Sequence, residues 1–134
     1  MIDNIILSPL VHLTVGSLVL LSNSMIFIAA GWLTLKKRAF TALASGLFIV
    51  FQISLLLQAA VGIKLLDQGL GILQLYIHYL GGVAPLVFCL IFYWFFSGPD
   101  AVTKSRRVAL TAGISLCFVA LTFAVGSMYV TGGA

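Results

Sequence analysis

The stretch VHLTVGSLVLLSNSMIFIAAGWLTL occupies residues 11–35 and contains no Asp, Glu, Lys or Arg. Three more apolar runs follow, at residues 40–63, 70–96 and 108–130. Each run is longer than the ~20 residues that an α-helix needs to cross ~30 Å of hydrocarbon. Because backbone groups in lipid must be paired internally, we expect these runs to be helices. The sequence therefore predicts an all-α protein, with residues 1–134 forming one integral membrane domain, a four-helix up-down bundle.

The composition supports a membrane protein. The chain is 62% hydrophobic and only 7% charged, whereas about 25% of the residues of a soluble domain are charged. The four runs use most of the chain, so no soluble domain is left over, and contact with the lipid bilayer is expected along the whole molecule.

The charged residues lie between the runs. Lys36, Lys37 and Arg38 form the first connection, and the third connection contains Lys104, Arg106 and Arg107 with Asp100. Lys64 and Asp67 cancel each other in the second. Since positive loops mark the cytoplasmic side, we expect the first and third connections in the cytoplasm and both termini outside. This pattern predicts a multi-pass protein of the inner (cytoplasmic) membrane, and the net charge of +4 is not a nucleic-acid signature.

Several function classes are disfavoured by what the chain lacks. It contains no Glu, and its Asp residues all lie outside the four runs. A proton or ion pathway built on membrane carboxylates is therefore not expected. Nucleotide-binding, nucleophile–base and metal motifs of the usual spacing are not found, and Cys89 and Cys117 are expected to be inert packing residues. The chain is more typical of a non-catalytic subunit than of an enzyme.

Two histidines are the strongest candidates for chemistry. His12 lies near the start of the first run and His78 in the first third of the third run. Both runs start on the same side of the membrane, so we expect both imidazoles in the outer leaflet, offset in depth by roughly 10 Å. Gly16 follows His12 by four residues, and Gly82 follows His78 by four, so each glycine shares the face of its histidine.

This arrangement suggests a tetrapyrrole. A flat macrocycle held between helices needs clearance, which the glycines would provide, and a haem iron takes two histidines from facing helices. We therefore predict one haem b ligated by His12 and His78. Two alternatives stay open: each histidine could bind the magnesium of a chlorophyll-type pigment, or the histidines and glycines could serve helix packing with no cofactor.

Amide side chains give weaker signals. Gln58 lies towards the outer end of the second run and Gln74 lies one turn before His78. Either amide could hydrogen-bond a quinone carbonyl or a haem propionate. Asn23 and Gln52 lie deeper in the membrane, where we expect them to join helices through hydrogen bonds worth ~0.6 kcal/mol each.

The layout resembles small bacterial four-helix membrane b-type cytochromes of the cytochrome b561-like group. The residues that carry the resemblance are His12, the basic turn at residues 36–38, the glutamines of the second run (Gln52 and Gln58) and His78. The resemblance covers the whole chain as a pattern, without a specific motif. Larger members of the group usually carry two histidine pairs, whereas this chain has only one.

Two functions follow from these observations. The first is an electron-transfer subunit with one haem b, which exchanges electrons with a membrane quinone or with other membrane subunits of an energy-transducing complex, respiratory or photosynthetic. The second is an accessory structural subunit of such a complex, without a cofactor or with bound lipid or pigment. The two are distinguished by whether His12 and His78 face each other.

Overall fold

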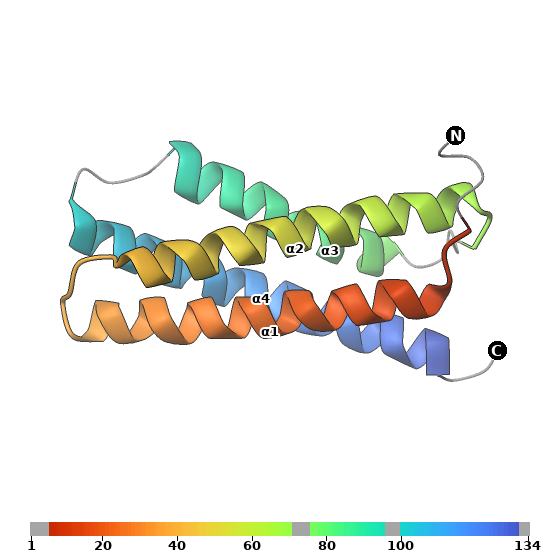
Figure 1. Ribbon diagram of the computed structural model, residues 1–134, viewed down its shortest axis with the longest axis horizontal. Helices are drawn as coiled ribbons and strands as arrows, with labels where there is room; N and C mark the ends of the chain where they lie inside the picture. Colours follow the sequence, from red (N-terminus) through yellow and green to blue (C-terminus); the bar gives the residue numbers. More distant parts are fainter. Residues whose placement is uncertain (1–5, 71–75, 96–99, 132–134) are drawn as a thin grey trace.

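A computed structural model of the chain describes residues 6–70, 76–95 and 100–131, with side chains of 93–95 and 129–131 left undescribed. It is all-α, as predicted, with helices α1 (Pro9–Leu35), α2 (Ala42–Asp67), α3 (Tyr76–Phe88), η2 (Cys89–Phe95) and α4 (Ala101–Thr131). Successive long helices run in opposite directions, so α1 starts and α4 ends at the same end of the bundle (Figure 1). Among the described residues, α1, α2 and residues 101–128 of α4 are long and apolar enough to cross a membrane, and Tyr76–Phe92 forms a shorter apolar helix.

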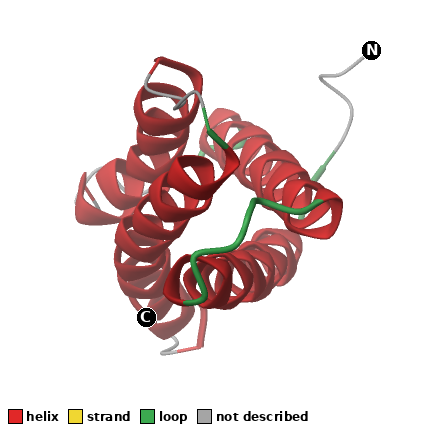
Figure 2. Ribbon diagram, turned by 90° about the vertical axis from the view of Figure 1, so that its left-hand side faces the viewer, coloured by secondary structure: helices red, strands yellow, loops and turns green. Residues whose placement is uncertain are grey.

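The four helices surround a common axis when seen from the end that carries the α1–α2 connection (Figure 2). α1 packs most extensively on α4 and then on α2, and α3 packs mainly on α4. α1 and α3 therefore lie diagonally across the bundle. Among the pairs of neighbouring long helices, α2 and α3 have the least extensive contact. The seam between them is therefore the loosest side of the bundle.

Local signals set the helix ends. Ser8 accepts a hydrogen bond from the Leu10 N–H at the start of α1, and Pro9 follows it at the first helical position, where its missing N–H costs nothing. Thr41 caps α2 in the same way, through the Ala44 N–H. Asp100 accepts hydrogen bonds from the N–H groups of Val102 and Thr103, which explains why α4 begins before its apolar run.

The C-terminal ends of α1 and α2 close with the same type of turn. At the end of α2, Gly69 adopts a φ of 74°, and the N–H groups of Gly69 and Leu70 donate to Leu66 and Leu65. This is the Schellman arrangement, in which a left-handed residue lets the last carbonyls be paired. The end of α1 repeats it with Lys37 at a φ of 52°. A lysine in this conformation is strained by about 1 kcal/mol or more relative to glycine.

α3 changes character along its length. Pro85 lies inside it and cannot donate the backbone hydrogen bond that a helix residue normally makes. One turn later the helix widens into the π-helix η2, the local adjustment that accommodates such a disturbance. Beyond this point the helix diverges from the other three (Figure 1).

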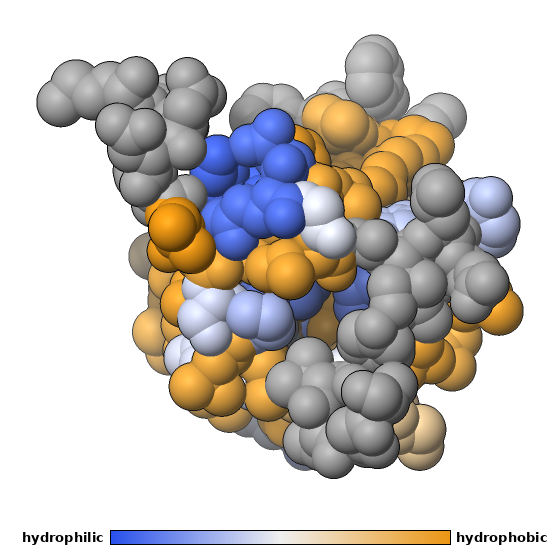
Figure 3. All heavy atoms as spheres, turned by 90° about the vertical axis from the view of Figure 1, so that its right-hand side faces the viewer, coloured by the Kyte–Doolittle hydropathy of each residue, from blue (hydrophilic) through white to orange (hydrophobic). Residues whose placement is uncertain are grey.

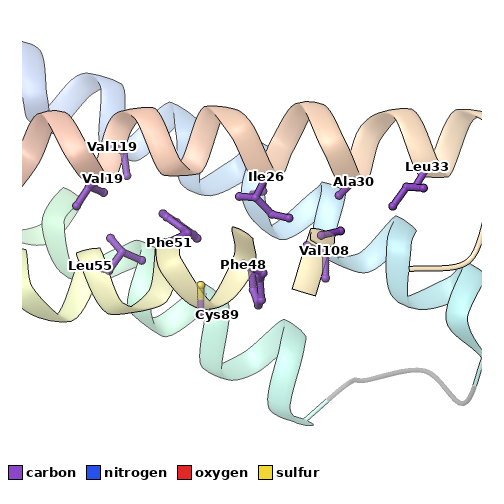
Figure 4. Packing of buried hydrophobic residues seen from close by; sticks show 12 residues of the cluster. Val19, Ile26, Ala30, Leu33, Phe48, Phe51, Leu55, Cys89, Val108 and Val119 are labelled. Atoms are coloured by element: carbon purple, nitrogen blue, oxygen red, sulfur yellow. The ribbon is translucent and has the colours of Figure 1, made fainter. Parts of the chain in front are cut away.

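The apolar core fills the middle of the bundle and the half nearest the α1–α2 connection. Its largest fully buried side chains include Ile26, Phe48, Phe51 and Val108, which meet between α1, α2 and α4 (Figure 4). Many other large apolar side chains point outwards, for example Leu35 and Leu43, as expected of helices that face lipid on one side.

Polar side chains join the helices at mid-bundle. Ser22 and Ser54 share a hydrogen bond of 3.0 Å between α1 and α2. Asn23 is fully buried, and with its amide oriented to suit its neighbours it donates to the Ala112 carbonyl (3.1 Å) and accepts from the Leu116 N–H (3.0 Å). The Ala112 carbonyl and the Leu116 N–H lie one helical turn apart in α4. Because Asn23 pairs with both, it fixes the register of α1 against α4.

Replacing Lys37 by glycine should stabilise the protein by about 1 kcal/mol, because glycine adopts a positive φ without strain. The measurement is the free energy of unfolding in a detergent titration. Lys36→Gly is the matched control, since it removes the same charge from a residue with φ of −85°. It should be neutral or destabilising; equal effects of the two variants would contradict the prediction.

Asn23→Leu, which keeps the branching and the number of side-chain heavy atoms and removes the amide, should lower the free energy of unfolding by about 1 kcal/mol, the sum of two interhelical bonds of ~0.6 kcal/mol. The same titration measures it. Ser24→Ala serves as the control, because the Ser24 hydroxyl donates to the Leu20 carbonyl of its own helix and to no other helix among the described residues. A loss for Ser24→Ala as large as that for Asn23→Leu would show that the interhelical bonds are not its cause.

Candidate functional site

The two histidines come together inside one end of the bundle. His12 lies in the first turn of α1 and His78 in the first turn of α3, the two diagonal helices. Their ring centroids are 5.8 Å apart, with the ring planes tilted by 58°. A centroid distance of 5.8 Å limits any difference in depth between the rings to that value, which is less than the roughly 10 Å expected from the sequence.

His12 is held by α2. Gln58 Nε2 donates to His12 Nε2 over 3.1 Å, and since an amide nitrogen can only donate, the ring proton lies on Nδ1. His12 Nδ1 and Gln58 Oε1 are both buried and have no hydrogen-bond partner within the described parts of the chain. Unpaired buried polar atoms cost about 1–3 kcal/mol each, so this part of the site lacks a donor and an acceptor that a ligand could supply.

His78 is held by α4. Its Nδ1 donates to the backbone carbonyl of Thr122 over 3.1 Å. A carbonyl only accepts, so the proton is fixed on Nδ1 and Nε2 carries a lone pair. A hydrogen bond from the second ring nitrogen to a carbonyl is the usual way in which proteins orient a metal-binding histidine. The Thr122 hydroxyl itself is buried without a partner among the described residues.

The start of α1 is fixed by the end of α2. The side chain of Gln68 donates to the Leu7 carbonyl (2.9 Å) and accepts from the Leu7 N–H (2.7 Å). Nearby, Lys64 and Asp67 form an exposed ion pair of 2.7 Å. Figure 3 looks onto this end, where a compact hydrophilic patch lies beside apolar surface.

Two glycines that sequence reasoning missed make room for the rings. A Cβ atom on Gly62 of α2 would lie 3.2 Å from His12 Cε1, and one on Gly126 of α4 would lie 2.8 Å from His78 Cε1. Each imidazole thus packs edge-on against the backbone of a neighbouring helix. The sequence offers little signal for this, because the clearance lies on a helix other than the one that carries the histidine.

The glycines singled out from the sequence serve other contacts. A Cβ on Gly16 would lie 3.2 Å from Gln58 Nε2 and 3.5 Å from the Phe123 ring, so protein side chains fill this space. A Cβ on the adjacent Gly81 would clash with the Thr122 hydroxyl, whereas a Cβ on Gly82 would meet the Thr122 methyl group at 4.0 Å. The other candidate, Gln74, lies outside the described residues.

The surface of α3 beside the pair is apolar. Tyr79 lies edge-on to His78 at 5.9 Å, and an open apolar hollow on the outside of α3 is lined by Tyr76, Ile77, Tyr79, Leu80 and Val83. Within the described ranges no third His, Cys, Asp or Glu joins the pair to make a protein-only metal site. Cys89 is buried in the core and Cys117 is exposed, and both are free thiols.

No protein-family model, curated protein or solved structure matches the chain. Its function is therefore argued from the residues of this site.

Gly126→Ala should displace His78 and lower the free energy of unfolding by about 1–3 kcal/mol, the usual cost of overpacking. Gly62→Ala should act on His12 in the same direction but less, because its contact is longer. The readouts are the free energy of unfolding and the imidazole nitrogen resonances in NMR spectra.

Gly46→Ala is the control, since a Cβ on Gly46 meets no atom within 4 Å. Alanine is the better helix former by up to ~1 kcal/mol, so this variant should be neutral or stabilised. Unchanged histidine resonances in Gly126→Ala would contradict the predicted contact.

Proposed function

We propose that the protein is a membrane electron-transfer subunit that holds one haem b between His12 and His78. The observation that carries the proposal is the meeting of two imidazoles from diagonal helices at a centroid distance of 5.8 Å. Two imidazoles on opposite sides of one metal ion lie roughly 6 Å apart between ring centres, from metal–nitrogen bonds of ~2 Å. The spacing of the pair therefore suits one shared iron.

The chemistry of the donor set fits as well. Neutral histidine is an established axial ligand of haem iron. His78 presents an Nε2 lone pair because the Thr122 carbonyl holds its proton on Nδ1. His12 Nε2 becomes available as a ligand when the single hydrogen bond from Gln58 is given up. Gly62 and Gly126 keep both rings close to the bundle axis.

The loose seam between α2 and α3 supports the same assignment. A macrocycle held between α1 and α3 must extend into one of the seams between neighbouring helices. The α2–α3 seam is the loosest, so it would need the least rearrangement. Bound haem b supplies a reversible one-electron couple. The residues of the chain keep the ligands in place, exclude water with Phe123 and Tyr79, and set the electrostatics of the site.

The exchange of electrons is proposed to take place at the histidine end. Gln58 Oε1 is an acceptor without a partner among the described residues, which suits the hydroxyl of a membrane quinol. The exposed apolar face of α3 around Tyr76 and Leu80 suits other membrane subunits of a larger respiratory or photosynthetic complex.

The proposed orientation follows from charge. The connection at Lys36–Arg38 and the start of α4 lie at the end opposite to the histidines, and positive charge favours the cytoplasm. In an inner membrane the histidines would then lie near the outer face, as would both termini.

A second candidate is an accessory structural subunit without a cofactor. It is favoured by the packing at Gly16 and Gly81, where Gln58, Phe123 and Thr122 occupy the space that a macrocycle would need. In this account the bonds His12–Gln58 and His78–Thr122 join α1 to α2 and α3 to α4. Binding of a chlorophyll-type pigment by one histidine is a variant of the same candidate.

The test is a reduced-minus-oxidised absorption spectrum of the full chain purified in mild detergent from haem-sufficient cells. The wild type should show a b-type difference band that is lost in both His12→Ala and His78→Ala. Val11→Ala and Ile77→Ala are the controls: they truncate exposed neighbours of the two ligands and should keep the band.

A featureless wild-type spectrum would overturn the haem proposal and favour the structural subunit. A band that survives both histidine substitutions would show that the ligands lie elsewhere. A chlorophyll-like band that does not respond to reductant would favour the pigment-binding variant.

A further inference from the structure

The basic residues of the chain are concentrated at one end of the bundle, which we term the basic end. Six of the seven Lys and Arg residues lie there, and the one acidic residue there is Asp100, so the side chains sum to +5 (six minus one). The six are Lys36, Lys37, Arg38, Lys104, Arg106 and Arg107. The seventh, Lys64, is paired with Asp67 at the other end.

Hydrogen bonds join the two segments that carry these charges. The hydroxyl of Ser105, in the first turns of α4, donates to the Arg38 carbonyl over 3.0 Å. The Phe40 N–H donates to the Ala101 carbonyl, also over 3.0 Å. Ser105 is completely buried at this junction. The α1–α2 connection and the start of α4 therefore form one continuous surface, although they are far apart in the sequence.

Aromatic rings fix two of the cations on this surface. The Arg38 guanidinium lies over the Trp32 ring at 5.3 Å and the Lys104 ammonium over the Phe40 ring at 5.2 Å. Such cation–π contacts are worth about 0.5–1 kcal/mol at exposed sites. Because Trp prefers the depth of the lipid headgroups, the Arg38 charge beside it lies at the depth of the lipid phosphates.

Exposed apolar side chains adjoin the cations. Leu35 at the end of α1 is 84% exposed and Leu43 at the start of α2 is 77% exposed. A ligand of this surface therefore meets positive charge and, next to it, exposed apolar side chains. This combination matches a molecule with an anionic head and hydrocarbon chains, and it suits neither a nucleic acid nor a soluble acidic protein.

We propose that the basic end is a binding site for an anionic phospholipid, whose phosphate lies between Arg38 and Lys104 and whose acyl chains lie against the exposed leucines. Membrane orientation needs only the number of positive charges. Orientation does not need the hydrogen-bonded junction at Ser105 or the two cation–π contacts, which hold Arg38 and Lys104 in fixed places. The proposal does not depend on the function of the histidine pair.

Asp100 does not cancel the site. Its carboxylate caps α4, and hydrogen bonding to Thr103 holds the pKa of Asp100 below its ordinary value. The carboxylate is thus engaged with backbone N–H groups at the start of α4. Each basic side chain near an anionic membrane surface contributes about 1 kcal/mol, which corresponds to a factor of ~5 in relative affinity.

The experiment measures quenching of Trp32 fluorescence by brominated lipids. The full chain carries Trp94→Phe, which leaves Trp32 as the one tryptophan. It is reconstituted in bilayers of brominated phosphatidylglycerol with plain phosphatidylcholine, and in bilayers of plain phosphatidylglycerol with brominated phosphatidylcholine. The wild-type basic end should prefer phosphatidylglycerol by about fivefold or more. Arg38→Gln combined with Lys104→Gln should reduce the preference to below about twofold.

Two matched variants make the test specific. Lys64→Gln removes one positive charge at the opposite end and should leave the preference unchanged. Ser105→Ala keeps every charge but removes the hydrogen bond to the Arg38 carbonyl, one of the two bonds at the junction, so it should weaken the junction and reduce the preference. Its folding is checked by the free energy of unfolding.

Three results would overturn the proposal. The first is an equal affinity of the wild type for the two lipids. The second is a preference that Arg38→Gln with Lys104→Gln leaves intact. The third is an unchanged preference in folded Ser105→Ala, which would show that charge alone, without the joined surface, attracts the lipid.

Discussion

A polar group inside a hydrocarbon layer has no water to bind, so it must find its partner within the protein. The backbone meets this requirement by forming helices. Some polar side chains meet it within their own helix, as Ser24 does, and others by reaching from one helix to the next, whereas Gln52 Nε2 and Ser115 Oγ are buried without a partner among the described residues. Asn23 binds the backbone of α4, Ser22 meets Ser54, and Gln58 meets His12. These contacts fix register and rotation where apolar packing alone would tolerate several arrangements.

The histidine pair follows from the same requirement. His12 and His78 lie near the starts of two diagonal helices. Each ring is held by a hydrogen bond from another helix, His12 by Gln58 of α2 and His78 by the Thr122 carbonyl of α4. The four helices thus contribute jointly to one small polar region. Among the described residues, His12 Nδ1 and Gln58 Oε1 have no partner, so these residues orient the rings without completing their hydrogen bonding.

Much of the fold could be predicted from the sequence, because helix length and apolar runs depend only on the thickness of the hydrocarbon layer. The rotation of each helix could not. In a membrane the lipid-facing and core-facing positions are both apolar, so no pattern showed that Gly62 and Gly126 contact the rings. The bond of Gln68 to Leu7 was missed for a similar reason, since it depends on where two helix ends meet. Gln58 was predicted at the histidine end, but its partner was not.

The most extensive helix contact in the bundle joins α1 to α4. During synthesis α1 leaves the ribosome first and α4 after the other three helices. Until then Asn23 has no access to the Ala112 carbonyl and Leu116 N–H. The hydrogen bonds that fix the register of α1 therefore form only when the last helix is in place, so the first helix of the bundle is aligned by the last one to be made.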